Sequence, residues 1–331
     1  MKGNTEPRIW TPPLRELTAD TSLGFAAIEY AKTILEMDLY PWQEWALIHE
    51  LEIIGTLGTP DWRFRFRTVV NMISRQNGKT ELSKVIASFF LNVLKVEAVF
   101  GTSLSMDKAE EVWEAVILEQ ETHPVLASDI QTIARRNGGK KLILTGLRTY
   151  KVGAPTRRAG RGDANDLVLL DEVREHRDWE IWSASVASTN AKPNGMVMCF
   201  SNAGDPDSIV LRQLRSQALE KISGTKSSDF GGSVDADALG WFEWSSPDKA
   251  ETNDLEALAQ ANPALGYGLL TERALLSNRD TFPESKFRSE CMCQQVETIL
   301  PEPFPDGSWE GGKNEDSFIV PESPLWFGID M

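Results

Sequence analysis

The chain has 331 residues, 41% of them hydrophobic and 25% charged, so it can bury a core of ordinary size. Its 34 Lys and Arg against 49 Asp and Glu give a net charge of −15, which excludes binding of nucleic acid through bulk charge and leaves only local basic sites. Three cysteines, three well-separated histidines and the lack of a long apolar run argue against a disulfide framework, a histidine metal site and a membrane protein.

From Arg63 to about Gly204, strands and helices are predicted to alternate. A helix is expected at 24–37, and a second at 79–94, where apolar residues recur on one face. KLILT and RTYKV are typical of a β-pair around Gly146-Leu147. Apolar runs without alternation indicate strands that are covered on both faces. Strands are expected at 69–73, 96–102, 167–171 and 196–201. This order predicts a mostly parallel α/β sheet flanked by helices.

The remainder of the chain has a different character. We expect a core of residues 1–205 and a small helical lid or linker subdomain of residues 206–300, with helices at 254–260, 271–281 and 283–296. Prolines and glycines are frequent in 301–324, which predicts a linker. The last residues, 325–331, resemble the start of a further strand.

A loop with the spacing of a phosphate-binding sequence lies between the predicted strand 69–73 and the helix after it. In ISRQNGKT (Ile73–Thr80), Gly78, Lys79 and Thr80 match the end of GxxxxGK[ST], while Ile73 replaces the first glycine. In such loops, backbone N–H groups and the lysine hold phosphates and the hydroxyl binds Mg²⁺. We therefore predict that ATP is bound by Ser74, Gln76, Asn77, Gly78, Lys79 and Thr80. The alternative is an ordinary helix start with an exposed lysine.

Polar residues end two further apolar strands. LVLLDE ends in Asp171, a predicted Mg²⁺ ligand, and Glu172, the predicted base that activates water. FSNAG ends the next strand, where Ser201 and Asn202 are predicted to sense the terminal phosphate. The alternative is that the strands simply end in solvated acids and a turn.

Taken in order, these stretches resemble the large terminase subunit of tailed bacteriophages, the DNA-packaging motor. The similar segments are LYPWQEWAL, RFRTVVNMISRQNGKTEL (Walker A), GRGDANDLVLLDEVREH (Walker B), FSNAG (coupling motif), ANPALG and FGIDM. The sequence departs from the family where Lys108-Ala109 replaces a Gln-Ala pair. The resemblance implies that Gln43 contacts adenine.

The resemblance also implies a fold and a function. It predicts a P-loop NTPase of the ASCE or RecA-like type, an Mg²⁺-dependent ATPase that translocates double-stranded DNA into a procapsid. The expected partners are DNA, a portal protein and the terminase small subunit, with assembly into a homo-oligomeric ring in the host cell cytoplasm at the procapsid portal and no membrane contact. In FGIDM, Asp330 resembles the first metal ligand of an RNase H-like nuclease domain. Two-metal chemistry needs several carboxylates, so we expect no nuclease activity and regard the chain as the ATPase part of a longer protein.

Hydrolysis also needs a cation at the developing phosphate charge. Arg75 is the candidate within the loop, and Arg158 or Arg161 is the candidate for a contribution from the same or a neighbouring subunit, although TRRAGRG is equally typical of a basic surface loop. DNA is expected to contact local clusters, which alternatively are solvated faces. The candidates are Arg63, Arg65 and Arg67, and Arg135-Arg136 with Lys140-Lys141.

Two other functions remain open. A helicase-like P-loop ATPase would act on nucleic acid without packaging, but it should carry a second RecA-like half that is not visible. A non-hydrolysing nucleotide-binding scaffold subunit would retain the loop without turnover.

Overall fold

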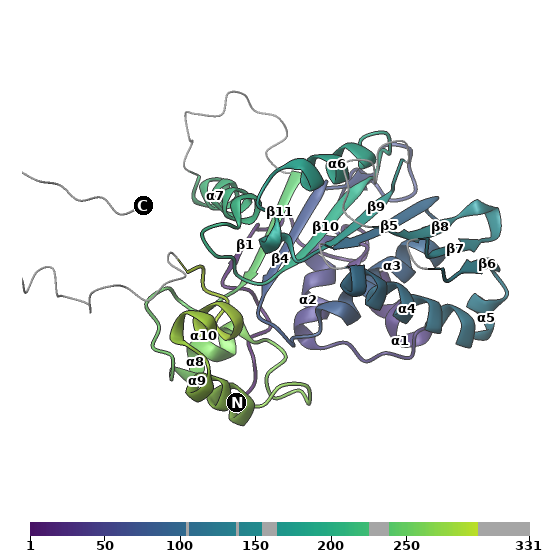
Figure 1. Ribbon diagram of the computed structural model, residues 1–331. Helices are drawn as coiled ribbons and strands as arrows, with labels where there is room; N and C mark the ends of the chain where they lie inside the picture. Colours follow the sequence, from purple (N-terminus) through teal and green to yellow (C-terminus); the bar gives the residue numbers. More distant parts are fainter. Residues whose placement is uncertain (104–105, 137–138, 154–163, 225–237, 297–331) are drawn as a thin grey trace, which may run out of the picture.

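The computed structural model describes residues 1–103, 106–136, 139–153, 164–224 and 238–296. Within these residues, a nine-stranded sheet forms the centre of the molecule, with helices on both faces (Figure 1). The strands run in the order β1 (Ile9–Trp10), β11 (Leu239–Trp244), β4 (Thr68–Ile73), β10 (Met196–Ser201), β9 (Leu167–Asp171), β5 (Ala98–Ser103), β8 (Thr149–Val152), β7 (Lys141–Leu144) and β6 (Ile130–Ala134). The six strands from β11 to β8 are parallel, while β1, β7 and β6 pair antiparallel.

The two faces of the sheet are covered by different helices because apolar side chains of the strands point alternately to each side. On one face lie α1 (Gly24–Thr33), α2 (Pro41–Glu50), α3 (Lys79–Asn92), α4 (Met106–Thr122) and α5 (Pro124–Ala127). On the other face lie α6 (Glu180–Thr189) and α7 (Ile209–Ser223). Along β4, for example, Val69 and Ile73 belong to the first core, and Val70 and Met72 to the second. A small hairpin, β2 (Ile53–Ile54) and β3 (Arg63–Phe64), lies outside this sheet.

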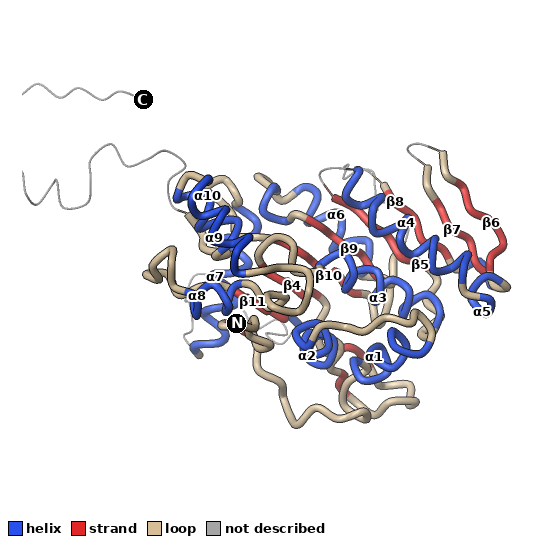
Figure 2. Tube along the Cα trace, turned by 90° about the horizontal axis from the view of Figure 1, so that it is seen from below, coloured by secondary structure: helices blue, strands red, loops and turns tan. Residues whose placement is uncertain are grey.

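Three shorter helices form a separate helical segment beside the end of the sheet. They are α8 (Leu255–Ala261), α9 (Glu272–Thr281) and α10 (Glu284–Cys291), and they pack around their own apolar core, which includes Leu258, Leu275 and Phe287. The N-terminus lies against this segment (Figure 2), where the backbone N–H of Asn4 donates to the carbonyl of Ala259. The first residues of the chain therefore tie the helical segment to the sheet.

The predicted strands and helices of the core are confirmed, with ends that differ by a few residues. The structure differs in one respect from the expected division between core and helical subdomain at residue 205. Leu239–Trp244 forms β11, which pairs in parallel with β4 inside the central sheet. α7 also packs on this sheet, through Val210 and Leu211. β11 and α7 thus belong to the core although they follow residue 205. Strands of one sheet can come from distant parts of the sequence.

A buried carboxyl group lies beneath the central strand β4. Glu50, in the last turn of α2, is fully buried beside the amide of Asn71. Burial raises the pKa of Glu50 to about 8. The folded protein therefore keeps this carboxyl protonated at pH values where the unfolded chain has lost the proton. Its contribution to stability is present below the ordinary pKa and is lost as the pH rises through about 8.

We therefore expect Glu50→Gln to stabilise the protein at neutral pH, by roughly 3 kcal/mol at most, because the neutral amide needs no proton. The stability of the wild type should fall from pH 5 to pH 8, and that of the variant should fall less. Urea unfolding across this range measures the effect. Glu44→Gln, on the exposed side of the same helix, is the control. Parallel pH profiles for wild type and Glu50→Gln would contradict the assignment.

Candidate nucleotide-binding site

The three polar stretches singled out in the sequence meet at one edge of the sheet. β10 lies between β4 and β9, and the three strands are parallel, so their carboxyl ends are neighbours. Ser201 is in register with Met72, and Phe200 with Asp171. The loop after β4, the acidic pair after β9 and the pair Ser201-Asn202 after β10 therefore lie side by side.

The loop between β4 and α3 has the backbone conformation of a tight turn that leads into a helix. Gln76 and Gly78 have positive φ angles of 59° and 90°, and α3 begins at Lys79. The Lys79 ammonium donates to the carbonyl oxygens of Ile73 (3.0 Å) and Ser74 (3.1 Å), so it arches back over the loop. Burial lowers the pKa of Lys79, and the nearby carboxylates of Glu172 and Asp171 act in the opposite direction. The ammonium is therefore bonded to the loop and close enough to the acidic pair to be influenced by its charge.

Side chains of the loop are held from outside it. The carbonyl oxygen of Cys291, at the end of α10, accepts a hydrogen bond from the Ser74 hydroxyl (3.1 Å). The Asn77 side chain is buried, and it donates to the Asn262 side chain (3.2 Å) and accepts from the Ala264 N–H (3.0 Å). The side chains of Ser74 and Asn77 thus bind the helical segment to the loop. Only the backbone groups of these two residues would be available to contact a phosphate.

Gln43 reaches the same loop from α2. Its carboxamide is buried, donates to the carbonyl of Gly78 (2.9 Å) and accepts from the N–H of Tyr40 (2.8 Å). In this structure Gln43 positions the start of α3. A contact between Gln43 and adenine stays a prediction.

Gly78 is required both by its backbone angle and by its neighbour. A Cβ atom at this position would lie 2.9 Å from Nε2 of Gln43. We expect Gly78→Ala to lower the free energy of unfolding by about 1–2 kcal/mol, because alanine is unfavourable in the left-handed backbone conformation. We also expect it to weaken ATP binding, because the added methyl group disturbs the contact with Gln43.

The matched control is Gly58→Ala, where φ is 85° and the added methyl group meets no atom. Thermal unfolding should show a loss of stability in both variants, and equilibrium binding of ATP a loss in Gly78→Ala alone. Equal ATP affinities in the two variants would contradict a role for this contact in shaping the loop.

The acidic pair lies opposite Lys79. Burial and the neighbouring Glu172 raise the pKa of Asp171, whose carboxylate accepts from the N–H of Glu172 (2.9 Å). Glu172 has a left-handed backbone, with φ of 55°. This conformation is uncommon for a residue with a side chain and is found often at functional sites. The Glu172 carboxylate forms an ion pair with Nε of Arg174 at 3.0 Å.

A carboxylate from the helical segment joins these groups. Glu290 of α10 contacts Nε of Arg75 (2.7 Å), Nη1 of Arg174 (3.0 Å) and Nδ2 of Asn202 (2.8 Å). We call these four residues the Glu290 cluster. The sequence analysis missed Arg174 and Glu290 as site residues. Arg174 could have been noticed because it follows Glu172 by two positions, whereas nothing in the sequence near Glu290 connects it with the loop.

The residues at this edge fit a bound Mg²⁺ ion. Asp171 is a partly buried carboxylate whose raised pKa would fall beside a divalent cation, and Thr80 supplies a hydroxyl in the first turn of α3. Among the described residues, no three or more His, Cys, Asp or Glu side chains are grouped so that they could hold a metal ion by themselves. Mg²⁺ commonly takes one or two protein oxygens and completes its shell with phosphate and water.

Some predicted residues cannot be compared with the structure in this way. Arg158, Arg161 and Asp330 lie outside the described residues, as do the predicted linker 301–324 and the predicted strand 325–331. No helix among the residues that the structure describes is long and apolar enough to cross a membrane.

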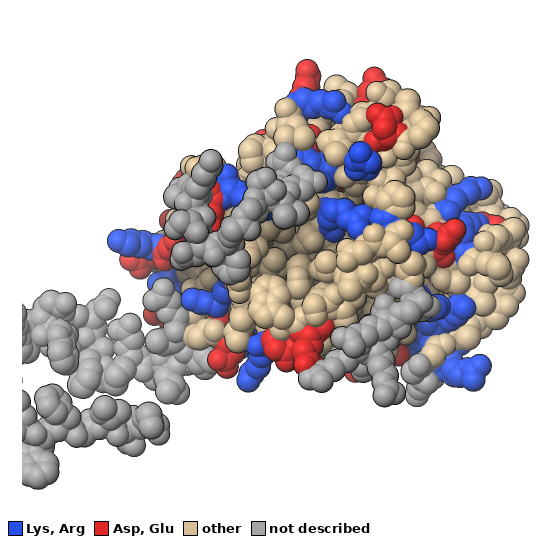
Figure 3. All heavy atoms as spheres, turned by 90° about the horizontal axis from the view of Figure 1, so that it is seen from above, with Lys and Arg blue, Asp and Glu red and all other residues tan. Residues whose placement is uncertain are grey.

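The two basic clusters considered for DNA are largely engaged in contacts with the protein itself. Arg65 is buried against Glu52 (2.7 Å), and Arg67 donates to the carbonyls of Thr189 and Lys192. Lys140 pairs with Glu110 and Glu114, and Arg135 pairs with Glu121. Figure 3 shows basic and acidic side chains next to one another on the face seen there. Four of the seven residues of these clusters are thus engaged within the protein, and Arg65 is buried rather than part of a solvated face.

Three features define a P-loop NTPase fold. They are the order of the strands, the loop that leads from β4 into α3, and the acidic pair at the end of β9, which is separated from β4 by one strand, β10. No family model and no curated protein sequence matches this chain.

Several solved structures have a similar fold. The large terminase of bacteriophage HK97 has a TM-score of 0.67 and 20% identity, and the match covers 87% of this chain and 58% of that one. The chain thus has the fold of a phage large terminase over somewhat more than half the length of that protein.

Two further structures match less closely. The large terminase ATPase domain of Thermus phage P74-26 has a TM-score of 0.48 and 18% identity, with 70% of this chain and 89% of that one covered. The large terminase of the thermophilic bacteriophage D6E in complex with ADP has a TM-score of 0.46 and 8% identity, with 69% and 48% covered.

Proposed function

We propose that this chain is the Mg²⁺-dependent ATPase of a viral DNA-packaging motor, which hydrolyses ATP to translocate double-stranded DNA into a procapsid. The observation that carries the proposal is the meeting of the loop 74–80, Asp171-Glu172 and Ser201-Asn202 at three adjacent strand ends. The fold shared with the HK97 large terminase supports the choice of motor. The proposed partners are double-stranded DNA, a portal protein and a terminase small subunit, in a ring assembled at the procapsid portal in the host cytoplasm.

The loop would bind the phosphates of ATP. N–H groups at the start of α3 point toward an anion there, and the Lys79 ammonium, now on the carbonyls of Ile73 and Ser74, would turn to phosphate oxygens. When bound with the nucleotide, Mg²⁺ neutralises phosphate charge. Thr80 and Asp171 would hold it.

Glu172 would accept the proton of the attacking water. A general base must reach that water and must be free to accept a proton. In the structure the Glu172 carboxylate is paired with Nε of Arg174. Binding of the terminal phosphate beside Arg174 would draw the guanidinium away and leave Glu172 available.

Ser201 and Asn202 would transmit the state of the site to the helical segment. The Ser201 hydroxyl accepts from the N–H of Arg174 (3.0 Å), and Asn202 donates to Glu290 of α10. A change at the phosphate would thus reach α10 through one side chain.

The ring would complete the site. We propose Arg75 as the arginine that acts within the subunit, and Arg158 or Arg161 as the arginine that a neighbouring subunit supplies. Mixing Arg158→Ala or Arg161→Ala subunits with Lys79→Ala subunits in an assembled motor should restore part of the ATP turnover. The absence of rescue at every ratio would reject the contribution in trans.

A strand-displacement experiment separates the proposed functions. The motor assembled on its portal is given ATP and a linear duplex that carries a third strand bound as a triplex. A duplex translocase releases the third strand and leaves the duplex paired, whereas a helicase separates the duplex. ATP-independent behaviour, or binding without turnover, would favour the scaffold function.

A further inference from the structure

The Glu290 cluster has the composition of an anion-binding site that is already filled. Two guanidinium groups and one amide contact a single carboxylate, at distances of 2.7 to 3.0 Å. The side chains of Glu290 and Arg174 are each only 10% exposed. Arginine forks and amide donors bind phosphate oxygens as readily as carboxylates. The anion comes from α10, which also places the Lys286 ammonium 4.0 Å from it, whereas Arg75, Arg174 and Asn202 come from the core.

These three partners lie where the proposed terminal phosphate of ATP would lie. Arg75 belongs to the phosphate-binding loop, Asn202 ends the strand next to it, and Arg174 also pairs with the proposed base Glu172. A phosphate dianion and the Glu290 carboxylate cannot share the same donors without strong repulsion. Occupation of the site by one of them therefore excludes the other.

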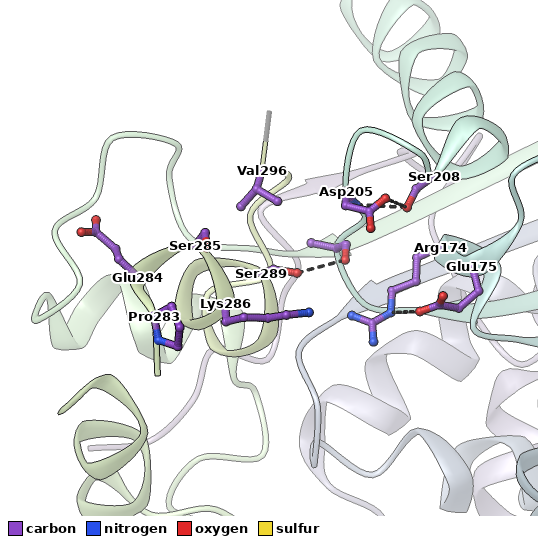
Figure 4. Close-up of a pocket in the computed structure, with 11 residues that line it drawn as sticks. Arg174, Glu175, Asp205, Ser208, Pro283, Glu284, Ser285, Lys286, Ser289 and Val296 are labelled. Carbon is purple, nitrogen blue, oxygen red and sulfur yellow. Dashed lines mark hydrogen bonds and ion pairs between the residues drawn. The ribbon is translucent and has the colours of Figure 1, made fainter. Parts of the chain in front are cut away.

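The surroundings of α10 leave it room to move. A cavity of about 580 Å³ separates its first turn, with Ser285 and Lys286, from Arg174 and Asp205 of the core (Figure 4). Lys286 and Arg174 project toward one another across this cavity. The contacts that join α10 to the core lie at its second half, where Ser289 donates to the carbonyl of Ala203 (3.3 Å) and Glu290 meets its cluster.

We propose that Arg75, Arg174 and Asn202 form the binding site for the terminal phosphate of ATP, and that Glu290 occupies this site in the nucleotide-free protein. This inference rests on the proposed function. ATP must displace Glu290, and α10 is then released from the core. ADP lacks the terminal phosphate and leaves Glu290 in place. Because of this competition, the apparent affinity for ATP equals the intrinsic affinity multiplied by the fraction of molecules in which Glu290 has left the site.

The test measures binding of ATPγS and of ADP to the whole chain by titration calorimetry, in the wild type and in Glu290→Gln. The neutral amide competes less, so we expect ATPγS to bind about tenfold tighter and ADP to change by less than about twofold. Glu284→Gln removes the same charge from an exposed position of the same helix and should change neither affinity. An equal change for both nucleotides, or no tightening of ATPγS, would overturn the proposal.

A measurement on the wild type covers the case in which Glu290→Gln does not fold. ATPγS should increase amide hydrogen exchange in residues 284–291, and ADP should not. Unchanged exchange with ATPγS bound would reject the displacement of Glu290. If the wild type binds no ATPγS at all, the proposed function fails as well. If it binds ATPγS but neither α10 nor the Glu290→Gln affinities respond, only the competition fails.

Discussion

Glu172→Gln is expected to lower ATP turnover by about 10²–10⁴-fold while the affinity for ATP stays within about threefold of the wild type. The amide has the same shape as the carboxylate but cannot accept the proton of the attacking water. It can still lie beside Arg174, which the wild-type carboxylate meets at 3.0 Å. Phosphate release measures turnover, and equilibrium titration measures affinity.

Glu251→Gln, on the exposed surface of the helical segment, is the control and should leave both quantities unchanged. Loss of binding together with turnover would mean that Glu172 shapes the site rather than acting as a base. Full turnover in Glu172→Gln would reject it as the base.

Lys79→Ala is expected to weaken binding of ATP by about 10²-fold or more, because a charge-assisted hydrogen bond to phosphate in a partly buried site is lost. The carbonyls of Ile73 and Ser74 also lose this donor. Equilibrium titration with ATP and ADP measures the loss, which should affect both nucleotides since the ammonium lies beside the loop itself.

The control for this variant is Lys249→Ala, which removes an exposed ammonium far along the chain. Thermal unfolding in the absence of nucleotide checks that Lys79→Ala is folded. A folded Lys79→Ala protein with wild-type affinity for ATP would contradict the assignment of residues 74–80 as the phosphate-binding loop.

The sequence predicts those parts of the fold and site that depend on local patterns. Apolar runs such as LVLLD and MVMCFS are strands in the structure, and the residues that follow them meet at one edge because parallel strands end together. The sequence does not show that β11 belongs to the central sheet, because its pairing with β4 depends on the whole sheet and not on residues nearby.

The residues that the sequence could not supply are those that act across long distances in the chain. Glu290 is one of several charges in a polar helix, and only packing of that helix on the core brings its carboxylate to Arg75 and Arg174. The clusters of basic residues also depend on contacts that the sequence does not show. Arg65 and Arg67 alternate as an exposed face would, but the contacts of Arg65 with Glu52 and of Arg67 with backbone carbonyls use them within the protein.

The most direct test is a high-resolution structure of Glu172→Gln bound to ATP and Mg²⁺. We expect the triphosphate on the loop 74–80, with the terminal phosphate beside Lys79, Arg75 and Arg174, and Mg²⁺ held by Thr80 and Asp171. A triphosphate bound elsewhere on the protein, or a loop that does not touch it, would contradict the proposal that this edge of the sheet is an ATPase site.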